Sequence, residues 1–196
     1  MPQTTPIDEL VVRLRAGDEA AVRELVADYE PYLRRTLRRR LARTPYQAIA
    51  DSADVCQAVF CSFFVRIAAG EYVVKSREDL VRLLNGMARK KLAELLRRES
   101  AQCRDRRRTI SLGSNRDIPA SPDGEPSLQM SGRELLANVS QRLPKEERFL
   151  FEQRRLGRSW HEIAEHLGET PMKLRKRLSR ALKQIIVDLG LEDADE

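Results

Sequence analysis

The sequence has few of the residues and patterns that mark catalytic or metal-binding proteins. Its 196 residues include three cysteines and two histidines, and no C-x-x-C pair or neighbouring histidine provides the spacing of a metal site. The odd number of cysteines favours reduced, mostly structural thiols. There is also no Gly-rich phosphate loop and no H-E-x-x-H motif. We therefore expect no metal, no cofactor and no catalytic residue.

Long apolar runs are absent as well. No stretch approaches the roughly 18 apolar residues of a membrane span, and the N-terminus lacks a basic segment followed by an apolar one. A cytoplasmic protein with no membrane insertion is expected. Charged residues make up 34% of the chain and the net charge is +6, which favours an acidic partner such as nucleic acid without identifying it.

Strand-like alternation is missing, whereas helical periodicity follows most of the chain, so the predicted fold class is all-α. Residues 109–131 are the exception, because they are rich in Gly, Pro, Ser and Asp and have no apolar stripe. As a flexible coil they would span about 25 Å. The chain is therefore predicted to form two small helical domains, 1–108 and 132–196, joined by a flexible linker.

Helix start and stop signals divide the N-terminal domain. Asp18 begins a helix that Pro31 is expected to kink or split. Asp51 can cap the next helix, DSADVCQAVFCSFFVRIAA, in which apolar residues recur every four positions. Ser76 and Asp79 form a capping-box-like start for a long helix rich in leucine.

The C-terminal domain contains short helices with clear boundaries. Ser159 and Glu162 form a capping box for WHEIAEHL, Gly168 ends that helix, and Thr170 caps the next one. Two helices joined by such a short turn form a helix-turn-helix. The second helix has apolar residues on one side and cations on the other.

A cationic helix face of this kind is either solvated or a surface for nucleic acid. Solvated faces usually intersperse both signs of charge, whereas here the acids cluster in the preceding helix and in the tail EDADE. We therefore predict that the second helix binds DNA. Its N-terminal part would enter the major groove with Thr170, Met172, Lys173 and Lys176, while Arg177 and Arg180 would hold phosphates.

Segments of both domains resemble a known family. LPKEERFLFEQRRLGRSWHEIAEHLGETPMKLRKRLSRALKQI is similar to region 4 of bacterial RNA polymerase sigma factors, and DSADVCQAVFCSFF followed by LLNGMARKKLAELLRR is similar to region 2. With a linker where region 3 would otherwise stand, this is the layout of the extracytoplasmic-function (ECF) class. The resemblance covers roughly residues 8–188.

The resemblance implies a non-enzymatic sigma factor that binds core RNA polymerase at its clamp and flap and directs promoter-specific transcription initiation. The C-terminal domain would read the minus-thirty-five element of promoter DNA, and the N-terminal domain would open the minus-ten element. An anti-sigma factor or a Ser/Thr kinase would be a regulatory partner.

An aromatic loop beside cations suits an opened DNA strand, because a flipped base needs a stacking surface and its phosphates need charge. The alternative for the loop tyrosine is a partly buried loop position. The predicted minus-ten residues, in and after the loop 70–75, are Tyr72, Lys75, Arg82, Arg89 and Lys90.

The predicted docking helix departs from the family pattern. Its polymerase contacts would be Asp51, Asp54 and Gln57, but Ser52, Ala53 and Ala58 stand where the family often has carboxylates. Phosphorylation of Ser52 would restore negative charge near a helix start, where the helix dipole favours it. The alternative is that Ser52 is only an N-terminal helix residue.

Two further functions compete with the sigma factor. A stand-alone regulator would bind duplex DNA as a dimer through the helix-turn-helix and recognise paired half-sites without polymerase. A helical hydrolase would use Asp51, Asp54 and a histidine. However, these aspartates lie at a helix start where caps are expected, and His161 and His166 belong to the other domain. The sigma factor is the leading hypothesis.

Overall fold

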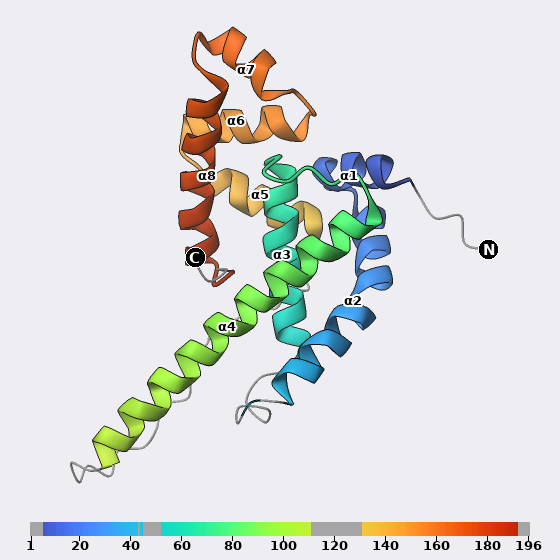
Figure 1. The fold of residues 1–196 in the computed structure, drawn as a ribbon. Helices are drawn as coiled ribbons and strands as arrows, with labels where there is room; N and C mark the ends of the chain where they lie inside the picture. The colour runs from blue at the N-terminus through green and yellow to red at the C-terminus, as the bar shows by residue number, and fades with distance from the viewer. Residues whose placement is uncertain (1–5, 43, 45–51, 111–130, 192–196) are drawn as a thin grey trace.

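The computed structural model describes residues 6–42, 44, 52–110 and 131–191. These residues form eight helices and no strand, which confirms the predicted all-α class (Figure 1). The helices are α1 (Ile7–Ala16), α2 (Glu19–Leu41), α3 (Ser52–Ala68), α4 (Arg77–Ile110), α5 (Gly132–Arg142), α6 (Lys145–Arg155), α7 (Trp160–Leu167) and α8 (Pro171–Asp188).

The starts of α2 and α4 have the caps that the sequence predicts. The Asp18 carboxylate accepts hydrogen bonds from two backbone N–H groups in the first turn of α2. The Ser76 hydroxyl accepts one from the N–H of Asp79 at 3.0 Å, while the Asp79 carboxylate accepts from the N–H of Lys75 at 3.3 Å. These side chains satisfy donors that the helix itself leaves unpaired.

Pro31 does not split α2, which continues from Glu19 to Leu41. Proline removes one hydrogen bond of the helix and crowds the preceding turn. Leu25 and Leu33, on either side of Pro31, are both fully buried. Their packing holds both parts of α2 against the core, and so it offsets the effect of the proline.

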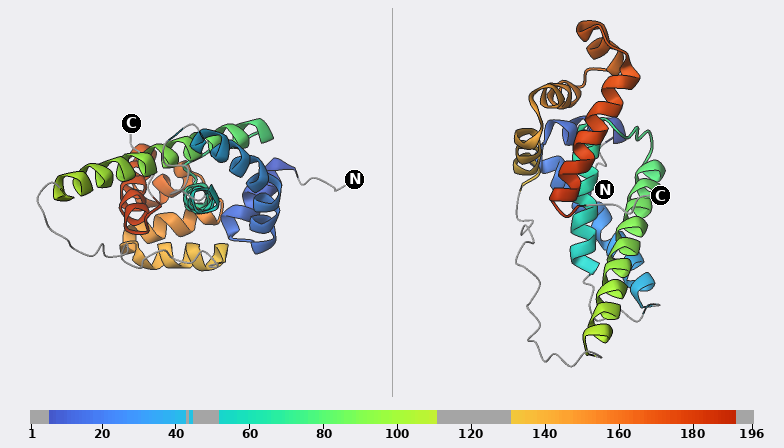
Figure 2. Two further views of the ribbon diagram at one scale, coloured as in Figure 1. Left: turned by 90° about the horizontal axis from the view of Figure 1, so that it is seen from below. Right: turned by 90° about the vertical axis from the view of Figure 1, so that its left-hand side faces the viewer.

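α3 lies at the centre of the molecule. Twelve of its 17 residues are buried, and it contacts α1, α2, α4, α5 and α6. The left view of Figure 2 shows it end-on among the other helices. The sequence predicted an apolar stripe of residues four positions apart, whereas in the structure apolar residues surround most of the helix. A helix of this kind has to be covered over most of its surface.

The C-terminal helices pack against the N-terminal ones. Gly132, at the start of α5, is so close to α2 that an added Cβ would lie 2.8 Å from Val22 Cγ2. Arg155 of α6 donates to the backbone carbonyls of Arg15 and Ala16 at the end of α1, at 3.4 and 3.2 Å. α4 ends at Ile110, two residues inside the predicted linker. The division into domains 1–108 and 132–196 stays a prediction.

Arg154 is buried where α6 meets the end of α3. Its side chain is 8% exposed, its guanidinium lies 5.1 Å from the centre of the Trp160 ring, and it donates to the carbonyl of Arg158. Burial lowers the pKa of Arg154. Gly70 packs directly on this guanidinium, because a Cβ at Gly70 would lie 2.6 Å from Arg154 Nε.

Replacing Gly70 by alanine is expected to destabilise the fold more than the same change at Gly168. Both glycines have positive φ angles, +67° and +64°, so both alanines incur a backbone cost of roughly 1–2 kcal/mol. Only at Gly70 would the new Cβ also displace a buried, hydrogen-bonded guanidinium, which adds about 1–3 kcal/mol. Urea unfolding should give G70A the lower midpoint. Equal midpoints would show that Arg154 moves aside at no cost.

Candidate nucleic-acid interface

α7 and α8 are joined by the short turn 168–170. The Ser159 hydroxyl accepts a hydrogen bond from the N–H of Glu162, and the Glu162 carboxylate accepts one from the N–H of Ser159 at 2.6 Å. Gly168 follows α7 in the left-handed conformation, and the Thr170 hydroxyl accepts from the N–H of Lys173. The predicted caps of both helices are therefore confirmed, and they fix the direction in which α8 leaves the turn.

α8 has one buried side and one exposed side. The buried residues of this helix are Leu174, Leu178, Leu182, Ile185 and Ile186. The exposed cations are Lys173, Arg175, Lys176, Arg180 and Lys183. At the helix start Thr170 is exposed and Met172 is 67% exposed. Polar, apolar and cationic side chains are thus displayed together on the first turns of α8, a combination that suits contacts to base edges and phosphates.

Arg177 differs from the other predicted DNA-binding residues. Its Nε donates to the Glu147 carboxylate of α6 at 2.8 Å, and its Nη2 donates to Glu146. Burial lowers the pKa of Arg177, but the two carboxylates outweigh this effect and raise it overall. Arg177 therefore ties α8 to α6, and the phosphate contact expected from the sequence would require this ion pair to open.

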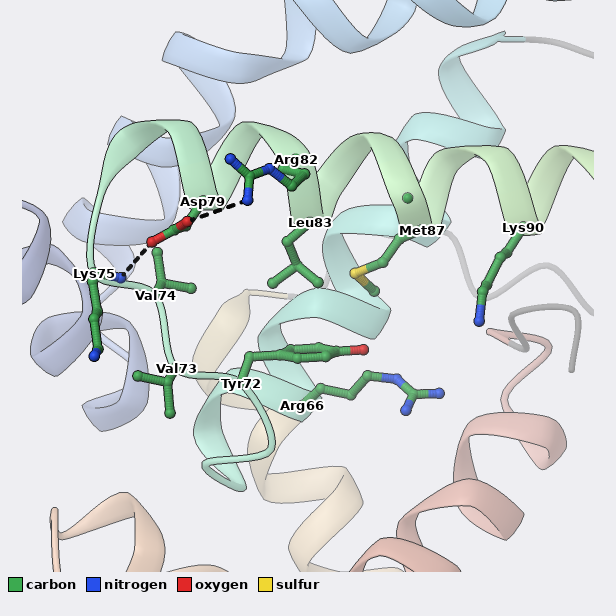
Figure 3. Close-up of a pocket in the computed structure, with 11 residues that line it drawn as sticks. Arg66, Tyr72, Val73, Val74, Lys75, Asp79, Arg82, Leu83, Met87 and Lys90 are labelled. Carbon is green, nitrogen blue, oxygen red and sulfur yellow. Dashed lines mark hydrogen bonds and ion pairs between the residues drawn. The ribbon is translucent and has the colours of Figure 1, made fainter. Parts of the chain in front are cut away.

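A second cationic surface lies where the loop before α4 meets that helix (Figure 3). Tyr72 and Lys75 of the loop and Arg82 and Lys90 of α4 line one cavity of about 810 Å³. Tyr72 is half-buried, as expected for a loop tyrosine with no role in binding DNA, but it also lines the cavity. Four of the five predicted minus-ten residues are therefore brought together.

The walls of this cavity combine apolar and cationic side chains. Figure 3 shows the Tyr72 ring between Arg66 and the side chains of Leu83 and Met87. Asp79 is the only carboxylate among the lining residues, and it lies 3.9 Å from Arg82. An aromatic and apolar wall beside cations can stack a base and neutralise its phosphates.

Seven of the eleven lining residues were not predicted as site residues, among them Arg66 and Met87. Arg66 lies on α3 and pairs with Glu71 at 3.1 Å, and the helical spacing of Met87 indicated only a core position. Arg89, which was predicted, lines a different groove, between α2 and α4. The spacing along the sequence could have predicted this separation. Arg82, Gly86 and Lys90 recur every four residues and lie on one face of a helix, whereas Arg89 does not lie on that face.

The start of α3 carries the predicted polymerase contacts. Asp54 is exposed and Gln57 is half-buried, whereas Asp51 lies outside the described residues. Ser52 is 5% exposed, and its hydroxyl accepts a hydrogen bond from Arg38 Nε at 3.3 Å. In this conformation a kinase would not reach Ser52, so phosphorylation would require the start of α3 to open.

The cysteines of α3 are buried thiols. Burial raises the pKa of Cys56 and of Cys61 to about 12, so both are protonated at neutral pH and poorly reactive. Within the described part of the chain, no three histidine, cysteine, aspartate or glutamate residues are grouped to hold a metal ion. None of the described helices has the length and apolar composition needed to cross a membrane.

Comparison with protein families identifies a match over most of the chain. The family described as ECF sigma factor matches residues 4–186, which include both cationic surfaces. No curated protein and no solved structure matches the chain.

The pair between Arg177 and Glu147 is expected to stabilise the fold more than the pair with Glu146. The Glu147 side chain is 15% exposed and that of Glu146 is 76% exposed, and solvent screens the exposed pair. Glu147→Gln should lower the free energy of unfolding by about 1 kcal/mol, and Glu146→Gln by less than about 0.5 kcal/mol. Urea unfolding of the two variants measures the difference. A larger loss in E146Q would contradict the assignment.

Proposed function

The chain belongs to the ECF sigma factor family, whose members act in transcription initiation, and we propose that it binds core RNA polymerase and directs initiation at specific promoters. The observation that carries this proposal is the extent of the family match. It covers the cavity beside Tyr72 as well as the cationic side of α8. A sigma factor needs both, because it recognises duplex DNA and holds an opened strand.

We assign recognition of the minus-thirty-five element to the helix-turn-helix formed by α7 and α8. The exposed first turns of α8 would enter the major groove with Thr170, Met172, Lys173 and Lys176. Arg180, one turn further along, is exposed and would contact phosphates. The buried leucines of α8 support this role, because they hold the helix on α6 and α7 while its other side faces DNA.

The minus-ten element would be held in the cavity beside Tyr72. Tyr72, Leu83 and Met87 offer a surface for an unstacked base, and Lys75, Arg82 and Lys90 offer charge to its phosphates. Asp54 and Gln57 of α3 would contact the polymerase clamp, and the C-terminal domain would contact the flap. Control by an anti-sigma factor fits this scheme, because such a partner would cover one of these surfaces.

Core polymerase binding is the property to test first. The purified full-length chain should retain bacterial core RNA polymerase in a pull-down, and the resulting complex should start run-off transcription from the promoter region of its own operon. Binding to duplex DNA with no association to polymerase would contradict the proposal and would favour a stand-alone regulator.

Lys176 and Arg180 are expected to have different roles in binding DNA. Lys176→Ala should cost about 1–3 kcal/mol on the preferred sequence and relax the choice of sequence, because the variant cannot bind a base edge at this position. Arg180→Ala should weaken binding evenly across sequences and reduce the slope of log K against log[salt] by about 1. Titrations of matched and mismatched duplexes at several salt concentrations measure both effects. The same behaviour in both variants would contradict the division of roles.

A further inference from the structure

A second groove lies between the C-terminal half of α2 and the middle of α4. It has a volume of about 520 Å³ and is lined by Thr36, Arg39, Arg40, Thr44, Arg89, Leu92, Ala93 and Leu96. Arg39, Arg40 and Arg89 are exposed, and no carboxylate is among the lining residues. We call it the α2–α4 groove.

The arginines of this groove have no carboxylate partner within the described part of the chain. No ion pair joins Arg39, Arg40 or Arg89 to a carboxylate there. Arginines that do pair with carboxylates are Arg13, Arg23, Arg34, Arg66, Arg82, Arg97, Arg98, Arg155 and Arg177. Positive charges that share one groove without a counter-charge repel each other, and an anionic ligand relieves that repulsion.

The helix dipole explains only part of this charge. Cations in the last turn of a helix are stabilised by the dipole, which accounts for Arg39 and Arg40 near the end of α2. It does not account for Arg89, which lies in the middle of α4 and faces the same groove from the opposite side. Two helices thus direct cations into one space.

The chemistry of the groove selects the phosphate backbone over bases. No aromatic side chain lines it, so it lacks the stacking surface with which proteins hold single strands. The guanidinium groups are donors that bind phosphate oxygens, whereas the hydroxyls of Thr36 and Thr44 already donate to the carbonyls of Tyr32 and Leu41. Arg89 also immediately precedes Lys90, which lines the cavity beside Tyr72, so the two cationic surfaces adjoin across α4.

We propose that the α2–α4 groove binds the phosphate backbone of double-stranded DNA. The position of that duplex, next to the opened minus-ten element, rests on the proposed function. The contact itself needs only the exposed cations of the groove and a DNA duplex.

The test compares two double variants of the full-length chain. Arg39→Gln/Arg40→Gln removes two charges from the groove, and Arg142→Gln/Lys145→Gln removes two exposed charges from α5 and α6. Fluorescence anisotropy measures binding to a duplex of random sequence and to a single-stranded oligo-dT at several KCl concentrations. For the groove variant on duplex DNA, the slope of log K against log[KCl] should fall by about 1.8, because each phosphate that the protein no longer neutralises accounts for roughly 0.9.

The control variant should keep the wild-type slope, and Arg39→Lys/Arg40→Lys should restore it because the charges return. Equal slopes in the groove and control variants would overturn the proposal, as would a reduced slope seen only with oligo-dT. Run-off transcription with wild-type protein separates this result from the proposed function. If the wild-type protein fails to initiate transcription, the sigma factor role is contradicted, but the salt slopes still test DNA binding by the groove. If the groove variant keeps the wild-type slope, DNA binding by the groove is contradicted, but the sigma factor role is not.

Discussion

Twelve of the 17 residues of α3 are buried, so other helices have to cover most of its surface. Its neighbours α1, α2 and α4 cover part of its surface, and α5 and α6 cover more of it. Phe63, Val65 and Ile67 are fully buried, and each such side chain contributes roughly 1.5–3 kcal/mol. The position of the C-terminal helices thus follows from the composition of α3 as much as from their own apolar faces.

Near the ends of several helices, arginine and lysine side chains donate hydrogen bonds to backbone carbonyls of another helix or of the turn after it. Arg15 Nε donates to the carbonyl of Ile67 near the end of α3 at 3.3 Å, and Arg155 donates to the carbonyls at the end of α1. Lys91 Nζ donates to the carbonyl of Gly190, just after α8, at 2.6 Å. The last carbonyls of a helix have no partner within it and carry the negative end of its dipole. The bonds of Arg155 satisfy two such carbonyls at the end of α1. The bonds of Arg15 and Lys91 likewise connect segments that lie far apart in the sequence.

Local features of the chain could be predicted from the sequence, and long-range contacts could not. The capping residues Ser159 and Thr170 and the two sides of α8 depend on residues three or four positions apart, so their patterns are visible in the sequence. The pair of Arg177 with Glu147 joins residues 30 positions apart, and no periodicity indicates it. The expected phosphate contact of Arg177 was a reasonable interpretation of one helix alone, because the competing carboxylate belongs to another helix.

The candidate site shows the same limit. The loop and helix that carry Tyr72 and Lys90 were predicted, but the face on which each α4 cation lies depends on how α4 packs against α2 and α3. Arg89 and Lys90 are adjacent in sequence and point about 100° apart around the helix. One lines the α2–α4 groove and the other the cavity beside Tyr72. A charge run seen in the sequence is therefore divided between two surfaces.

The first turns of the helices show where stability and function require different charges. In each of the other seven described helices, an acid lies in the first turn, where the helix dipole favours negative charge. The first turn of α8 has no acid and has Lys173 instead. Glu169 lies just before the cap and pairs with Lys173 at 2.7 Å, which offsets only part of the unfavourable charge. A phosphate at this helix start would meet the positive end of the dipole and a lysine together. Among the described helices, the one that departs from the rule is the one to which we assign contact with DNA.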